Sequence, residues 1–183
     1  MALLFGILSK APFMRQFSII LLCMIAVQAF GQKSIPPTEE FLVTGSVNRD
    51  VTVKISDLKN YPSVRIKKVR ITNHLGVYKG TLKQLRGIRI VDLLKPIEIT
   101  APSPRALNEY CLIFEAADGY KAVFSWNEVF NSPTGRNIFV ITRKGGVDCS
   151  NLNERIMVLA PRDLNTGRRY IKCLTRITIQ RVN

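Results

Sequence analysis

Short runs of β-branched and aromatic residues, separated by turn-forming residues, occupy most of the chain after about residue 40. Such runs predict β-strands, which we place at residues 41–43, 51–55, 64–72, 110–116, 120–124, 137–142, 155–159 and 170–179. In the third run apolar and charged residues alternate, and the alternation slips once at Lys67-Lys68. That slip predicts one strand with a β-bulge.

Helical signals are few and short. Ser56 can cap a helical turn through Leu58, and the apolar spacing of residues 88–94 suits a short helix. Ser125 and Glu128 have the spacing of a capping box at the start of another. With no internal repeat or linker, the pattern predicts a single α+β, mostly β domain.

Two glycine-containing turns join predicted strands. Asp118-Gly119 is a strong two-residue hairpin signal. The basic turn at residues 142–146 could cradle a phosphate through its backbone amides. As a plain hairpin loop it needs no such role, and we favour the hairpin.

The first 31 residues differ from the rest. They contain no acidic residue, two basic residues (Lys10 and Arg15), an apolar run at residues 17–27, and small residues at Ala29 and Gly31. This is the layout of a secretory signal peptide spanning residues 1–31. The apolar run is shorter than the roughly 20 residues that cross a bilayer. A retained membrane anchor is the alternative.

Cleavage after residue 31 would leave an exported protein, periplasmic or extracellular, without stable membrane insertion. Residues 32–40 then form an extended lead-in, because Pro36-Pro37 prevents helix. A single domain follows at residues 41–183.

The chain is strongly basic. Its net charge is +14, and removal of two basic residues with the signal peptide leaves 25 − 13, or +12. Such a charge favours anionic partners, so we expect a small anionic ligand or a periplasmic protein partner. Export argues against nucleic acid. A solvated basic surface without a ligand remains the alternative, and the sequence does not indicate an oligomeric state.

Three cysteines lie after residue 31, and an oxidising compartment permits a disulfide. Cys149 and Cys173 are the favoured pair, since they flank a two-strand stretch. Cys111 lies in an apolar run and is expected to be a buried, inert thiol.

A series of short motifs runs in order from about residue 41 to residue 181. They are VTGSV (43–47), SDL with YP (56–58 and 61–62), RGIRIVDLL (86–94), DGY (118–120), SWNE (125–128), RIMVLAP (155–161) and IKCLTRITI (171–179). Their order and spacing resemble the molybdopterin-binding domain of sulfite-oxidase-like proteins. The resemblance implies a sulfite-oxidase-like α+β fold, mostly β, with short helices.

The resemblance also implies a metal site, but this sequence lacks the residue that would bind the metal. In active members a cysteine of the third strand binds molybdenum, to which a soft thiolate is suited. By strand position that cysteine would fall near Ile71 or Thr72, and no cysteine occurs between residues 41 and 108. We therefore expect no metal ligand and no bound cofactor, although a molybdopterin is the one cofactor that the resemblance allows.

Five residues are candidates for contact with an anionic cofactor or ligand: Thr72, His74, Arg86, Arg169 and Lys172. Thr72 stands at the expected ligand position, and His74, the only histidine, lies just beyond it. The other three are basic, as the cofactor's anionic tail would require in the family. A solvated basic face is the plainer interpretation of the last two.

Three functions follow from these observations. The leading hypothesis is a binding or accessory module that has lost molybdenum chemistry, with no catalytic residue predicted. The second is an oxidoreductase whose metal is ligated by Thr72 or His74. The third is an electrostatic binder of anionic polymers or headgroups.

Overall fold

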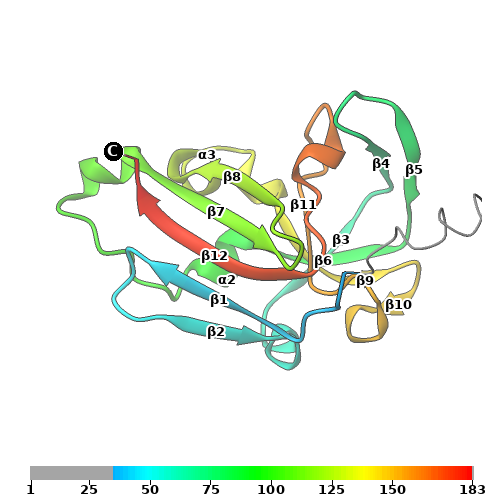
Figure 1. The fold of residues 1–183 in the computed structure, drawn as a ribbon, viewed down its shortest axis with the longest axis horizontal. Coiled ribbons are helices and arrows are strands. Elements are labelled where there is room, and N and C mark those ends of the chain that lie inside the picture. Colours follow the sequence, from blue (N-terminus) through cyan, green and yellow to red (C-terminus); the bar gives the residue numbers. More distant parts are fainter. Residues whose placement is uncertain (1–34, 183) are drawn as a thin grey trace, which may run out of the picture. The chain divides into compact units, whose positions relative to one another are not determined.

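Two β-sheets form the framework of residues 35–182, the part of the chain that the computed structural model describes (Figure 1). The first sheet has the strand order β2-β1-β12-β7-β8. Its strands are β1 (Glu40–Gly45), β2 (Val51–Lys54), β7 (Tyr110–Ala116), β8 (Lys121–Ser125) and β12 (Leu174–Arg181). Strand β1 pairs parallel with β12, and the other neighbours are antiparallel.

The second sheet has the order β10-β9-β6-β3, with β11 paired to β9. Its strands are β3 (Ser63–Ile66), β6 (Leu85–Arg89), β9 (Phe139–Lys144), β10 (Val147–Asp148) and β11 (Met157–Leu159). A separate two-stranded hairpin is formed by β4 (Val69–Thr72) and β5 (Tyr78–Leu82). In Figure 1 this hairpin stands beside the segment that follows β11.

The helices of the described residues are short. Helices α2 (Ile90–Leu94) and α3 (Trp126–Phe130) are accompanied by 3-10 turns at Ile55–Asn60, Pro104–Glu109, Gly135–Asn137, Cys149–Asn151 and Thr166–Arg169. The hydroxyl of Ser125 accepts a hydrogen bond from the backbone N–H of Glu128 at 3.0 Å, as predicted for the start of α3. Ser56, however, is not a cap, because the turn begins at Ile55 with Lys54 before it.

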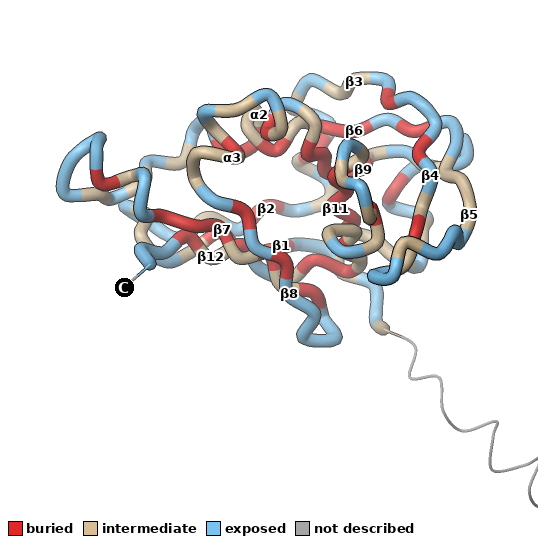
Figure 2. The backbone as a smooth tube through the Cα atoms, turned by 90° about the horizontal axis from the view of Figure 1, so that it is seen from above, coloured by how far each residue is buried: buried red, intermediate tan, exposed pale blue. Residues whose placement is uncertain are grey.

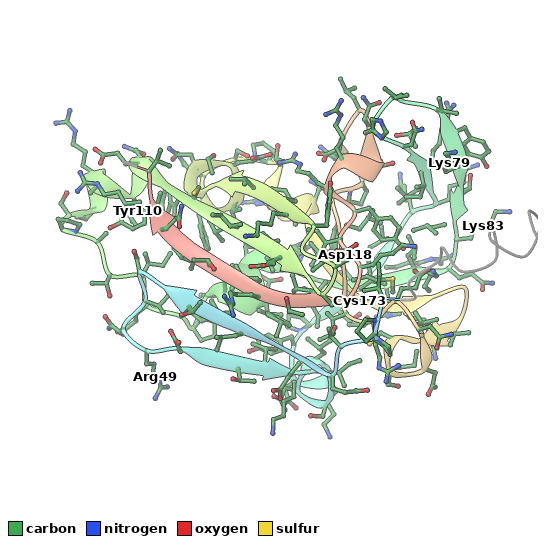
Figure 3. The ribbon with its side chains drawn as sticks, viewed as in Figure 1. Arg49, Lys79, Lys83, Tyr110, Asp118 and Cys173 are labelled. Atoms are coloured by element: carbon green, nitrogen blue, oxygen red, sulfur yellow. The ribbon has the colours of Figure 1, made fainter. Side chains whose placement is uncertain are left out.

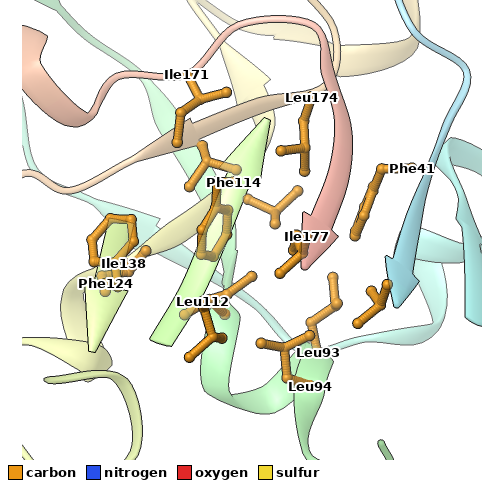
Figure 4. Close-up of a cluster of buried hydrophobic side chains, with 14 of the residues drawn as sticks. Phe41, Leu93, Leu94, Leu112, Phe114, Phe124, Ile138, Ile171, Leu174 and Ile177 are labelled. Carbon is orange, nitrogen blue, oxygen red and sulfur yellow. The ribbon is translucent and has the colours of Figure 1, made fainter. Parts of the chain in front are cut away.

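Two clusters of buried side chains hold the layers together. Figure 2 marks the buried residues along the backbone. The larger cluster joins the first sheet to α2 and to one face of the second sheet, and Figure 4 shows its centre around Phe114, Ile177 and Leu93. Within it the rings of Phe114 and Phe124 meet edge to face with centroids 5.1 Å apart. Both clusters lie within residues 35–182, so this unit carries its own hydrophobic core.

The predicted single strand at residues 64–72 is wrong. The chain leaves the second sheet after Ile66 and forms β4 in the separate hairpin from Val69 onward. Lys67 and Lys68, where the alternation slips, are exposed and lie between the two strands. The slip therefore marks a change of sheet, which lets the hairpin project from the second sheet.

The glycine-containing turns are hairpins, as favoured. Asp118-Gly119 joins β7 to β8, and Gly145 and Gly146, both with positive φ, join β9 to β10. The predicted signal peptide lies outside the described residues, as do residues 32–34 of the lead-in, and residues 35–38 of the lead-in form neither helix nor strand. Among residues 35–182, no helix is long and apolar enough to span a bilayer.

The favoured disulfide between Cys149 and Cys173 is not formed. Both residues are free thiols, as is Cys111, and all three are buried. The thiol of Cys173 faces the carbonyl of Asn153 at 3.9 Å. Burial raises the pKa of the Cys149 thiol to about 11, with a further contribution from the charge of Asp148. Cys111 is a buried thiol in β7, as predicted.

Candidate functional site

A cavity of about 580 Å³ lies between the β4–β5 hairpin and the segment that follows β11. Its walls come from the link between β3 and β4, from strand β4, from Phe139 at the start of β9, and from residues 161–166. The hairpin wall exists only because the chain changes sheets at Lys67-Lys68. Thr72, at the end of β4, lines the cavity.

The cavity wall is strongly cationic. Five of its residues are basic: Arg65, Lys67, Lys68, Arg70 and Arg162. Asp163 is the only acidic residue among those that line it, and both of its carboxylate oxygens accept hydrogen bonds from Arg169. The wall therefore has an excess of positive charge, which a bound anion would balance.

Thr72 itself is buried, with 7% of its surface exposed. Its backbone N–H donates to the hydroxyl of Thr166 at 3.1 Å, and that hydroxyl donates in turn to the carbonyl of Arg70 at 2.9 Å. The hydroxyl of Thr72 has no hydrogen-bond partner among the described residues. A buried hydroxyl without a partner is costly, so this atom is available to a ligand or water.

Gly167 brings the 3-10 turn Thr166–Arg169 against the hairpin. A Cβ at this position would overlap the backbone carbonyl oxygen of Thr72. Glycine is therefore required for the close approach by which Thr166 reaches the backbone of β4. The same approach closes one side of the cavity.

Arg169 fixes this turn from the other side. Its guanidinium donates to Asp163 at 2.6 and 2.7 Å and to Glu128 of α3 at 2.6 Å, and it lies 4.2 Å from the centroid of the Phe124 ring. The hydrogen bonds that it donates to Asp163 and Glu128 raise the pKa of Arg169, although burial opposes them. Its charge is thus balanced within the protein, and the residue does not line the cavity.

Lys172 belongs to a second polar cluster around Glu154. The carboxylate accepts hydrogen bonds from Lys144 at 2.6 Å, Lys172 at 3.1 Å and the Tyr170 hydroxyl at 3.3 Å. Burial alone would raise the pKa of Glu154, but the two lysines outweigh it and lower the pKa. Burial and the adjacent Glu154 charge raise the pKa of Tyr170.

The remaining two candidates also lie outside the cavity wall. His74 is exposed in the hairpin turn, and its carbonyl accepts a hydrogen bond from the Arg168 guanidinium at 3.1 Å. Arg86 is exposed on β6 and donates to the carbonyl of Ser63 at 2.8 Å. Of the five predicted residues, therefore, the structure places only Thr72 in the cavity.

The cationic residues of the cavity wall were not among the predicted site residues. Arg65, Lys67, Lys68 and Arg70 are the charged positions of the alternating run for which one strand was predicted. One feature of the sequence could have identified them: the stretch between Asp57 and Asp92 contains nine arginines and lysines and no acidic residue. Such a run indicates a surface that selects anions.

A molybdenum centre of the expected kind does not fit these residues. Thr72 offers a hydroxyl in place of a thiolate, and none of the cysteines within residues 35–182 lines the cavity. The described residues also contain no cluster of three or more histidine, cysteine or acidic side chains suited to a metal ion. The cationic wall, in contrast, fits an anionic group such as a phosphate.

No protein-family model and no curated protein sequence matches the chain. Among solved structures, it is similar to the sulfane dehydrogenase SoxCD from Paracoccus pantotrophus, with a TM-score of 0.55 and 13% identity. The match covers 76% of this chain and 37% of that one, so the chain spans well under half of the neighbour's length. At this identity the likeness shows the fold alone.

The comparison confirms the predicted fold class. The described residues form a mostly β, α+β domain with a sulfite-oxidase-like fold, and the similarity to the dehydrogenase is one of fold.

Proposed function

We propose that this domain is an exported binding module that takes a small anion into the cationic cavity beside Thr72, without molybdenum redox chemistry. One observation carries the proposal: Thr72, whose buried hydroxyl has no partner among residues 35–182, lines a cavity with five basic residues and one neutralised carboxylate. Export is supported by the signal-peptide pattern of residues 1–31.

The charge of the wall determines the class of ligand. Guanidinium groups bind carboxylate and phosphate oxygens in a bidentate way, and lysines add point charges. Asp163 would repel an anion if it were free, but Arg169 neutralises it at 2.6 Å. The cavity volume of about 580 Å³ falls within the range of small-molecule sites.

The test is calorimetric titration with inorganic phosphate and with sulfate, at low ionic strength, of the chain that begins at Ile35. Binding of either anion should weaken at least tenfold in the double variant R65Q/R162Q, since both arginines line the cavity and neither forms an ion pair among the described residues. The matched control, R49Q/R105Q, removes the same charge from exposed positions outside this cavity and should bind as the parent does.

Two results would contradict the proposal. Equal binding by both double variants would show that the anions respond to net charge and not to the cavity. Molybdenum at close to one atom per chain, in protein purified from its native host, would favour instead an oxidoreductase with non-cysteine ligation.

A further inference from the structure

The hairpin and the neighbouring loop expose large apolar side chains at one place. Leu164 is 97% exposed, Leu75 is 72% exposed and Val77 is 53% exposed. We call these three residues the apolar tip. Single exposed apolar residues are common on protein surfaces, but a group of them usually marks an interaction site.

The two parts of the tip lie side by side. A Cβ on Gly76 would stand 3.1 Å from the Oδ1 atom of Asn165, and Arg168 donates to the carbonyl of His74 at 3.1 Å. Figure 1 shows the same proximity between the turn after β4 and the segment after β11. Leu75 and Leu164, each next to one of these contacts, are therefore presented together.

The turn that carries Leu75 has a defined conformation. The side-chain oxygen of Asn73 accepts hydrogen bonds from the backbone N–H groups of Leu75 and Val77, both at 3.0 Å, and the Asn73 N–H donates to the Val77 carbonyl at 2.9 Å. These bonds hold the chain in a closed loop. The exposure of Leu75 is thus a property of an ordered turn.

Basic residues lie on the same hairpin and loop as the apolar tip. Arg70 lies over the Tyr78 ring at 5.2 Å, and Lys79 lies on the outer strand of the hairpin (Figure 3). Arg162 and Arg168 flank Leu164 in the adjacent loop and are exposed. Asp163, the single acidic residue of these two segments, is bound to Arg169. An apolar centre with a cationic rim is the pattern of an interfacial membrane-binding surface.

We propose that the apolar tip docks this domain onto an anionic lipid bilayer, with Leu75 and Leu164 entering the headgroup boundary and the basic rim contacting the headgroups. Such binding is peripheral, because it is made by exposed side chains of a turn and a loop. Leu164 and Gly76 also line the Thr72 cavity. Docking would therefore bring the cavity mouth close to the membrane surface.

The proposal is tested by co-sedimentation of the chain that begins at Ile35 with vesicles of 70% phosphatidylcholine and 30% phosphatidylglycerol. This chain excludes the apolar run at residues 17–27, which would bind lipid by itself, and retains the complete core. Binding should be strong to these vesicles and at least tenfold weaker to pure phosphatidylcholine. It should also weaken as salt increases.

Matched variants separate the apolar contribution to vesicle binding from the electrostatic contribution. L75Q should weaken vesicle binding on the order of tenfold, because one leucine no longer enters the apolar region. V123Q, which alters a side chain 53% exposed on β8, should bind as the parent does. K79Q should weaken binding several-fold at low salt, and K95Q, at another exposed lysine, should not.

A spectroscopic measurement reports insertion directly. L164W should show a blue-shifted emission on addition of anionic vesicles, in excess of any change from the native Trp126. Unchanged emission, or full vesicle binding by L75Q, would overturn the proposal. So would a dimer in light scattering that L75Q converts to monomer, since the tip would then bind a second copy. Because L75Q and K79Q leave the cavity wall intact, phosphate binding and vesicle binding can fail independently.

Discussion

The buried hydroxyl of Thr72 gives the sharpest test of the site. The change T72V replaces this hydroxyl by a methyl group of similar size. Thr166 provides a matched control, because it is equally buried, at 4% exposure against 7%, and T166V makes the same chemical change. The two hydroxyls differ in one respect. The Thr166 hydroxyl accepts a hydrogen bond from the backbone N–H of Thr72 and donates one to the carbonyl of Arg70, whereas the Thr72 hydroxyl has no partner among the described residues.

The expected effects have opposite signs. A buried polar group without a partner costs about 1–3 kcal/mol, so T72V should raise the free energy of unfolding by about 1 kcal/mol in ligand-free buffer. T166V should lower it by about 2 kcal/mol, because the N–H of Thr72 and the carbonyl of Arg70 both lose their partner. For a domain of this size, 1 kcal/mol corresponds to a shift in Tm of about 4 °C.

Urea denaturation followed by circular dichroism measures both changes. The same series in excess phosphate tests function, because a ligand that uses the Thr72 hydroxyl stabilises the parent but not T72V. Destabilisation by T72V as large as that by T166V, in ligand-free buffer, would refute the reasoning. It would show that the hydroxyl already has a partner.

Three further predictions concern the surroundings of the site. G167A should lower the free energy of unfolding by several kcal/mol and reduce phosphate binding, because the new Cβ overlaps the carbonyl of Thr72; a normal Tm would show that the turn can move away without cost. Lysines lower the pKa of Glu154, so its stabilising effect is complete above the unfolded-state pKa and is lost as pH falls through the lower folded-state value. E154Q should therefore be less stable than the parent at pH 7 by urea denaturation, and the difference in stability should shrink below about pH 4.5. A difference that grows in acid would contradict a lowered pKa for Glu154. Alkylation of denatured, unreduced protein beginning at Ile35 should label three thiols by mass spectrometry, whereas labelling of one would restore the Cys149–Cys173 disulfide.

The local elements were predictable from the sequence because their signals are local. Asp118-Gly119 forms a hairpin wherever strands flank it, and Ser125 caps α3 through a hydrogen bond only three residues away. The same holds for the apolar runs that became β7 and β9. The order of these elements was sufficient for the fold class, which the structural comparison confirms.

The site could be predicted only in part. Thr72 was found because the family resemblance specifies a strand position. Arg169 was chosen for its charge alone, yet its guanidinium is neutralised by Asp163 and by Glu128, which is 41 residues away in sequence. Composition predicts that a basic chain attracts anions, but it does not show which charges have partners.

The sequence by itself determined the mostly β composition, the excess of positive charge and the absence of a cysteine at Thr72. Only the tertiary structure decided that the chain changes sheets at Lys67-Lys68 and that the hairpin meets the turn at Gly167. The physical reason is the range of the interactions. Strand propensity and turn chemistry act between neighbours, whereas the cavity wall joins residues about 90 positions apart, as in the hydrogen bond between Thr72 and Thr166.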